Sequence, residues 1–169
     1  MTGPVTRVVT FSRYGSTDEV GAWIAAALTR EQDQSVYFTD STEDPSTGMG
    51  EASAVIVGAP VYAQHLLAEA RHFLAARQHL LAGRDLWLFT CSMSALGVND
   101  LAHDAPDLVP AGVAHFAGRL DFARLNRAER LLMRALRQSG GDRREQAVVE
   151  HWAASIGRVG ALLAPVPRR

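Results

Sequence analysis

Short apolar runs alternate along the chain with longer stretches of helical periodicity. Runs rich in β-branched residues predict strands; they cover residues 5–11, 35–39, 52–60, 85–91 and 112–118. Apolar positions that recur every three or four residues predict helices; these cover residues 17–30, 64–81, 124–138 and 143–163. The strand predicted at 52–60 is almost continuously apolar, as expected of a strand covered on both faces.

Strands that alternate with helices predict a parallel sheet with right-handed crossovers. Five strands fit a three-layer α/β sandwich with the order 2-1-3-4-5, whose ligand crevice lies at the carboxyl ends of strands 1 and 3. A chain of 169 residues with 47% hydrophobic content is long enough to bury one core. We therefore predict one domain over residues 1–169, with a basic segment at 119–144 and a frayed tail at 164–169.

A loop of small and hydroxyl residues separates the first predicted strand from the first helix. This first loop consists of Ser12, Arg13, Tyr14, Gly15, Ser16 and Thr17. The free N–H groups and the dipole at a helix start favour an anion. Hydroxyl groups donate to phosphate oxygens, and glycine allows a close approach of the backbone. The loop predicts a phosphate site; the alternative is an ordinary turn in which Ser16 or Thr17 caps the helix.

Two further loops are expected at the same edge of the sheet. The second loop comprises Pro60, Val61, Tyr62 and Ala63, and the third loop comprises Ser92, Met93, Ser94, Ala95, Leu96 and Gly97. Tyr62 offers a flat apolar face with one polar tip. The third loop offers small residues and backbone N–H groups to the polar edge of a flat ring. Together with the first loop, the second and third loops predict a site for a mononucleotide that has a planar head group.

The composition excludes several kinds of chemistry. All 17 basic residues are arginine, so a Walker-type phosphate loop and a pyridoxal phosphate Schiff base are excluded. The single cysteine, Cys91, rules out a disulfide framework within the chain. We see neither a secretory start nor an apolar run long enough to cross a bilayer, and we expect a cytoplasmic protein.

Three histidines recur every seven residues in the helix predicted at 64–81: His65, His72 and His79. Seven residues of helix rise about 10.5 Å, which is too far for neighbours in this series to share one ion. We therefore predict no metal site from this series.

The charge is distributed unevenly. Residues 1–118 carry six arginines against thirteen acidic residues, whereas residues 119–144 carry eight arginines against three. Five arginines share one side of the helix predicted at 124–138, and leucines and alanines occupy the other; the arginines are Arg124, Arg127, Arg130, Arg134 and Arg137. Such a helix suits peripheral contact with an anionic membrane, at the inner membrane face, or with a protein partner. A core-packed helix with a solvated arginine face is the more common arrangement, and nucleic acid is disfavoured by the lack of interleaved aromatic residues.

Three segments carry a resemblance to the flavodoxin superfamily. The series Ser12-x-Tyr14-Gly15-x-Thr17 resembles its phosphate signature, and Gly58-x-Pro60-x-Tyr62 resembles its second flavin loop. Residues 117–152 are similar to the menaquinone-dependent protoporphyrinogen oxidase branch. The resemblance implies a flavodoxin-like sandwich that binds FMN. The phosphate would lie on residues 12–17 and the isoalloxazine between residues 60–63 and 92–97.

The function implied by this resemblance is that of an FMN-binding oxidoreductase that passes electrons to a quinone or a similar small redox substrate. The flavin would carry the redox chemistry, and no protein acid or base is implied. Two alternatives stay open: a small electron-transfer flavodoxin, and a cofactor-free or deazaflavin-binding relative that serves as a binding module. Residues 92–110 are shorter and more acidic than the basic insertion of the oxidase branch, so a porphyrinogen substrate is left open.

Overall fold

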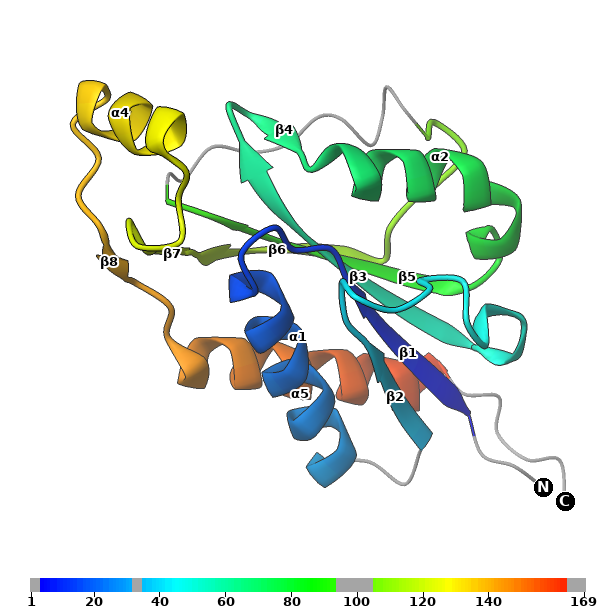
Figure 1. The fold of residues 1–169 in the computed structure, drawn as a ribbon. Coiled ribbons are helices and arrows are strands. Elements are labelled where there is room, and N and C mark those ends of the chain that lie inside the picture. Colours follow the sequence, from blue (N-terminus) through cyan, green and yellow to red (C-terminus); the bar gives the residue numbers. More distant parts are fainter. Residues whose placement is uncertain (1–3, 32–34, 94–104, 164–169) are drawn as a thin grey trace, which may run out of the picture.

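A parallel sheet between two layers of helices forms the body of the protein (Figure 1). We describe it from a computed structural model, which places residues 4–31, 35–93 and 105–163. The strands of the main sheet are β1 (Val5–Thr10), β2 (Ser35–Thr39), β3 (Ala54–Tyr62), β4 (His65–Leu66), β5 (Asp85–Ser92) and β6 (Gly112–Ala117). The order β2-β1-β3-β5-β6 confirms the predicted order of the parallel strands, and β4 pairs antiparallel with the end of β3.

The helices lie on both faces of this sheet, with α2 on one face and α1 and α5 on the other (Figure 1). The helices on the two faces are α1 (Ser16–Glu31), α2 (Ala68–Leu81) and α5 (Gln146–Leu163). The helix α4 (Arg127–Ala135) lies outside these layers, and a short 3₁₀ turn, η1 (Met49–Glu51), precedes β3. A two-stranded ribbon of β7 (Arg119–Leu120) and β8 (Gly141–Asp142) flanks α4 in the chain. None of the helices in the described part of the chain is both long and apolar enough to cross a bilayer.

Each face of the sheet supports its own hydrophobic core. Below α2, Val57 of β3 packs with Phe73 and Leu74. On the other face, Phe89 of β5 packs in a cluster that includes Trp152 of α5, at 6.3 Å between ring centroids. Because β3 lies in the middle of the sheet, its side chains are buried on both faces, which explains the continuous apolar run predicted there.

The hairpin between β3 and β4 corrects the predicted start of the second helix. Residue 64 was expected to begin that helix, but α2 begins at Ala68. Ala63 and Gln64 both have positive φ, at 48° and 71°, and form the two-residue turn of the hairpin. Such turns usually contain glycine or asparagine, which are absent here, so the local signal was missing. Pro60 to Tyr62 are consequently part of β3 rather than of a loop.

The same hairpin separates the three histidines. His65 lies in β4, whereas His72 and His79 lie on α2. Among the described residues, no group of three or more His, Cys, Asp or Glu side chains is placed to hold a metal ion.

The arginine-rich helix is shorter than predicted and does not pack into a core. It spans Arg127–Ala135, so Arg124 precedes it, and Arg137 follows it with a φ of 53°. Asn126 and Glu129 form a capping box at its start. No side chain of α4 is buried. The more common arrangement, a core-packed helix with a solvated arginine face, is therefore wrong for this helix.

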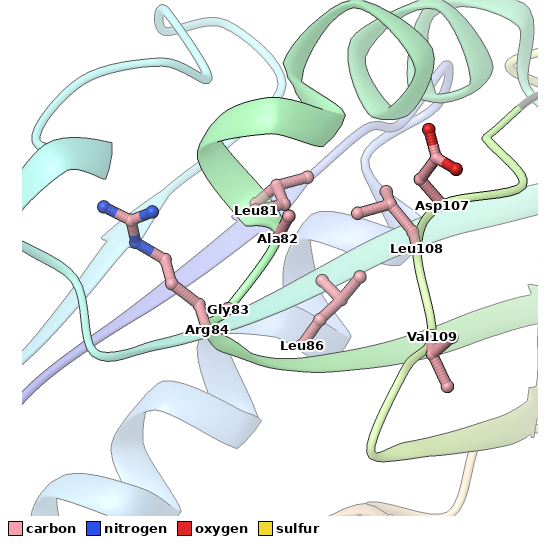
Figure 2. A pocket seen from close by; sticks show the side chains of 8 residues that line it. All are labelled: Leu81, Ala82, Gly83, Arg84, Leu86, Asp107, Leu108 and Val109. Atoms are coloured by element: carbon pink, nitrogen blue, oxygen red, sulfur yellow. The ribbon is translucent and has the colours of Figure 1, made fainter.

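A cavity of about 140 Å³ lies at the beginning of β5, close to the end of α2 (Figure 2). It is lined mainly by aliphatic side chains, with Arg84 and Asp107 at its sides. The guanidinium of Arg84 donates to the carbonyl oxygens of Ala52, Gly50 and Leu80. Arg84 thus holds the connections before β3 and β5 in place. The cavity includes none of the predicted site residues.

Candidate functional site

The three predicted loops follow the neighbouring strands β1, β3 and β5, whose carboxyl ends meet at one edge of the sheet. The backbone N–H of Phe11 donates to the carbonyl of Gly58 at 2.8 Å and continues the pairing of β1 and β3 to this edge. Pro60 and Val61 are buried within β3, and Val61 belongs to the core below α2. Of the third loop, Ser92 and Met93 are described; Ser94, Ala95, Leu96 and Gly97 lie outside the described residues.

The first loop ends where α1 begins, and the hydroxyl groups of the loop do not cap this helix. Gly15 has a φ of 81°, and its carbonyl accepts the N–H of Glu19 at 3.1 Å. This is the first bond of α1, so Gly15 occupies the cap position and the helix begins at Ser16. The alternative in which Ser16 or Thr17 caps the helix is therefore wrong.

The side-chain oxygen of Ser16 is the polar atom at this edge that most clearly indicates a ligand. Its Oγ is buried and has no hydrogen-bond partner among the described residues. Buried hydroxyl groups are almost always hydrogen-bonded, so an orphan of this kind calls for an explanation. At the start of α1 it lies where free backbone N–H groups and the helix dipole favour an anion. The hydroxyl of Thr17, in contrast, is buried beside Cys91.

Two acidic residues in the first turn of α1 are compensated by partners of their own. Asp18 accepts hydrogen bonds from the hydroxyl groups of Thr10 and Ser41, both at 2.6 Å. Glu19 forms ion pairs with Arg119 at 3.1 Å and with Arg144 at 2.8 Å. An isolated carboxylate would repel a phosphate at the helix start. These contacts reduce that repulsion.

The basic segment 119–144, which we call the basic arm, lies against the first loop. Arg124 donates to the carbonyl of Tyr14 at 2.6 Å. The hydroxyl of Tyr14 donates to Glu129 of α4 at 2.6 Å, and Arg13 forms an ion pair with the same carboxylate at 2.6 Å. We call Arg13, Tyr14 and Glu129 the clasp. It joins residues more than a hundred positions apart, and no local pattern in the sequence indicates such a contact.

The clasp shifts the pKa values of two of its members. Partial burial and the hydrogen bond to Glu129 raise the pKa of Tyr14 to about 12, so Tyr14 remains a donor at neutral pH. The hydrogen bonds from Tyr14 and from the Asn126 backbone, with the charge of Arg13, lower the pKa of Glu129. The clasp therefore contributes fully above the ordinary glutamate pKa of about 4.3, and its contribution is lost as the pH falls through the lower pKa of the folded protein.

Arg144 attaches the other end of the basic arm to α1. Its side chain is only 3% exposed and forms ion pairs with Asp142 at 2.6 Å and Glu19 at 2.8 Å. It also donates to the carbonyl of Ser16 at 3.3 Å, and its guanidinium lies 5.0 Å from the ring centroid of Trp23. The hydrogen bonds from Arg144 lower the pKa of Asp142 to about 2. The ion pairs are therefore intact at neutral pH.

Tyr62 is the aromatic residue at the end of β3, and 44% of its surface is exposed. Partial burial raises the pKa of its hydroxyl, and the charges of Arg13 and Glu129 also act on it. Tyr62 therefore lies at the end of β3, within electrostatic range of the clasp, and is partly open to solvent. This position suits stacking against a flat heterocycle next to the first loop.

Cys91 lies at the end of β5 and is buried. Burial raises the pKa of its thiol to about 12. Because the thiolate is the reactive form, we expect no labelling of the folded protein by a thiol reagent at pH 8 within an hour, and complete labelling in denaturant. Rapid labelling of the native protein would show that this part of the site opens to solvent.

Comparison with known proteins decides the family. A family model described as a flavodoxin domain matches residues 7–146, which is most of the chain. The chain belongs to the flavodoxin-domain family. A comparison with curated proteins found no match to this flavodoxin domain.

Solved structures share the fold of this flavodoxin domain at low sequence identity. Oxidised flavodoxin 1 from Bacillus cereus matches with a TM-score of 0.60 and 15% identity, covering 95% of this chain and 99% of that one. A flavodoxin from the domain Archaea matches with a TM-score of 0.57 and 13% identity, covering 92% and 97%. The rubredoxin oxygen:oxidoreductase of Desulfovibrio gigas matches with a TM-score of 0.59 and 16% identity. That match covers 97% of this chain but 38% of the oxidoreductase, so this chain spans well under half of the length of the oxidoreductase.

Family membership indicates a flavin-binding electron-transfer protein whose cofactor is FMN. The residues of this flavodoxin domain fit the phosphate of such a cofactor. Ser16 offers a buried hydroxyl that has no partner in the described part of the chain, and Gly15 brings the backbone close at the start of α1. Tyr62 fits the flavin ring as an exposed aromatic residue at the same edge.

The ion pair between Arg13 and Glu129 in the clasp is expected to affect the affinity for FMN. Glu129 places a carboxylate on Arg13, a cation of the first loop, so this carboxylate and the FMN phosphate compete for Arg13. We expect Glu129→Gln to tighten FMN binding by roughly threefold to tenfold at low salt, measured by quenching of flavin fluorescence. The matched variant Glu51→Gln, which removes an exposed acid of η1 at the other edge, should leave the affinity unchanged. Weaker binding to Glu129→Gln would instead show that the clasp holds the first loop in its binding conformation.

Proposed function

We propose that this flavodoxin domain is an FMN-dependent oxidoreductase that passes electrons to a quinone or a similar small acceptor. The observation that carries the proposal is the position of the basic arm. Arg124 donates to the Tyr14 carbonyl of the first loop, and Arg144 donates to the Ser16 carbonyl at the start of α1. Small electron-transfer flavodoxins usually surround the flavin with acidic residues, whereas at this edge Glu19 and Glu129 are paired with arginines.

The chain itself would position the cofactor and shape access to it. FMN would supply the transfer of electrons. The hydroxyl of Ser16 and the N–H groups of the first turn of α1 would bind the phosphate. Tyr62 would cover one side of the flavin ring. Arg124 fixes the first loop by its hydrogen bond to the Tyr14 carbonyl. The predicted phosphate-binding loop is therefore held in place by a residue that lies outside the main sheet.

A quinone fits this edge for two reasons. It is flat and apolar enough to lie against a stacked aromatic ring. Its oxygens gain negative charge on reduction, which neighbouring guanidinium groups stabilise. The similarity of residues 117–152 to the menaquinone-dependent protoporphyrinogen oxidase branch supports the same acceptor class.

A small electron-transfer flavodoxin is the second candidate. The matches to flavodoxins favour it, because they cover 97–99% of those chains. Such a protein would exchange electrons with another redox protein and would react slowly with a free quinone.

The two candidates differ in the partner that reoxidises the reduced protein. The protein is loaded with FMN, reduced without oxygen by dithionite, and mixed in a stopped-flow instrument with menadione or with an oxidised ferredoxin-type protein. The proposal predicts reoxidation by menadione that saturates with menadione concentration and is at least about tenfold faster than reoxidation of free reduced FMN. Fast exchange with the protein partner, together with a menadione rate no higher than that of free flavin, would favour the electron-transfer flavodoxin.

A further inference from the structure

The leucines of α4 face away from the protein. The side of α4 that faces the body carries Glu129, Arg130 and Met133, which are partly buried. Leu131 and Leu132 are 70% and 54% exposed, and Leu136, which follows the helix, is 57% exposed. These three leucines form the apolar patch of α4. Figure 1 shows α4 outside the two helical layers that cover the main sheet.

The charged side chains next to this patch are arginines. Arg127, Arg134 and Arg137 are exposed, and among the described residues they form no ion pair. Glu129 is the acidic residue of α4, and its carboxylate is held inward by Arg13 and Tyr14. The outward side of α4 therefore combines leucines with uncompensated arginines.

The rest of the structure holds α4 in place without covering this patch. The capping box of Asn126 and Glu129 fixes the helix start, and Arg130 donates to the Leu125 carbonyl at 2.9 Å. Leu125 is buried, and the clasp ties Glu129 to the first loop. A short helix in isolation would be marginal in water, so these contacts are what keep it formed. The patch is thus presented on a preformed helix.

We propose that α4 docks on an anionic lipid surface. Helices that lie in a membrane interface place leucines at the acyl boundary and arginines among the lipid phosphates. The long arginine side chains reach the headgroups while their stems cover apolar surface. A protein interface of this size would be expected to present an aromatic anchor. The exposed side of α4 has aliphatic and arginine side chains only.

This docking would place the edge of the sheet at the membrane, because the clasp connects α4 directly to the first loop. A quinone dissolved in the bilayer would then be close to the flavin. The inference goes beyond the proposed function and depends on α4 alone. Since the test below uses neither flavin nor quinone, its failure would leave the menadione result unaffected.

The test is flotation of the full-length protein with lipid vesicles. Vesicles of phosphatidylcholine are compared with vesicles that contain about one third phosphatidylglycerol, at about 20 mM and about 500 mM salt. We expect the protein to bind the phosphatidylglycerol vesicles at low salt and to bind at least about tenfold more weakly at high salt or to phosphatidylcholine alone. The joint variant Leu131→Asn, Leu132→Asn, Leu136→Asn should lose binding by at least about tenfold at low salt, as should the joint variant Arg127→Gln, Arg134→Gln, Arg137→Gln.

Two matched controls separate α4 from the general properties of the protein. Val109→Asn with Val113→Asn removes exposed apolar side chains near β6, and Arg30→Gln with Arg71→Gln and Arg77→Gln removes the same charge from the other helices. Both controls should bind like the parent protein, and thermal melts should confirm that all variants fold. Absence of binding to phosphatidylglycerol vesicles at low salt would overturn the proposal. So would self-association of the parent protein that only the leucine variant removes, since the patch would then be an interface between copies.

Discussion

Replacing Ser16 with aspartate should abolish FMN binding and leave the fold intact. The Oγ of Ser16 is buried at the start of α1 and has no partner among the residues that the structure describes, so a carboxylate there would face the phosphate. Two like charges about 4 Å apart repel by about 4 kcal/mol in a partly buried site, which corresponds to roughly a thousandfold in affinity. An acidic residue in the first turn also interacts favourably with the helix dipole, which offsets part of the cost of burying the carboxylate, so the protein should still fold. Fluorescence titration with FMN and a thermal melt measure the two effects separately.

The milder variant Ser16→Ala removes only one hydrogen bond to a charged group and should weaken FMN binding by about tenfold. Ser53→Ala is the matched control, because the hydroxyl of Ser53 bonds to the carbonyl of Val5 at the other edge of the sheet. It should leave FMN affinity unchanged. Full FMN affinity in Ser16→Asp would show that the phosphate does not lie at the start of α1.

Replacing Arg144 with glutamine should give the largest loss of stability among the charged residues of the basic arm. Arg144 is almost fully buried and makes charge-assisted hydrogen bonds to Asp142 and Glu19, each of which is partly exposed. Because solvent screens those two carboxylates, we expect a loss of about 2 kcal/mol in the free energy of unfolding. For a chain of this size, that corresponds to a fall in Tm of about 4 to 8 °C. Calorimetry at neutral pH measures it.

Arg143 offers a matched control in the neighbouring position. Its side chain is exposed and donates to the hydroxyl of Ser139 at 3.1 Å. Arg143→Gln removes the same charge and should change the free energy of unfolding by less than about 0.5 kcal/mol. An equal loss in both variants would mean that net charge, and not the buried contacts of Arg144, stabilises the basic arm.

The strands and their order could be predicted from the sequence, because local patterns determine them. The period of apolar residues identified β2 with its observed bounds and β1 to within one residue. The strand–helix alternation then left few topologies for a parallel sheet. The start of α1 was also predicted closely, since the hydroxyl residues and Gly15 mark it. The flavodoxin-domain family and its cofactor followed from the same motifs.

The contacts of the basic arm could not be predicted, because they join distant parts of the chain. Arg144 meets Glu19 across 125 positions, and no periodicity connects the two. The hairpin at Ala63 and Gln64 was missed because neither residue favours a positive φ. Whether α4 packs into a core or stays exposed was left open for a related reason. Amphipathic spacing predicts that a helix has an apolar side but does not tell what that side contacts.

The central claim is that the first loop binds a phosphate. The most direct test of this claim compares the binding of FMN with the binding of riboflavin. The two flavins share the same ring and ribityl chain and differ only in the phosphate. Calorimetric titration of the purified protein should show FMN binding at least about a hundredfold tighter than riboflavin, because the start of α1 and Ser16 would bind the phosphate, which riboflavin lacks. Equal affinities for the two flavins, or no binding of either, would contradict it.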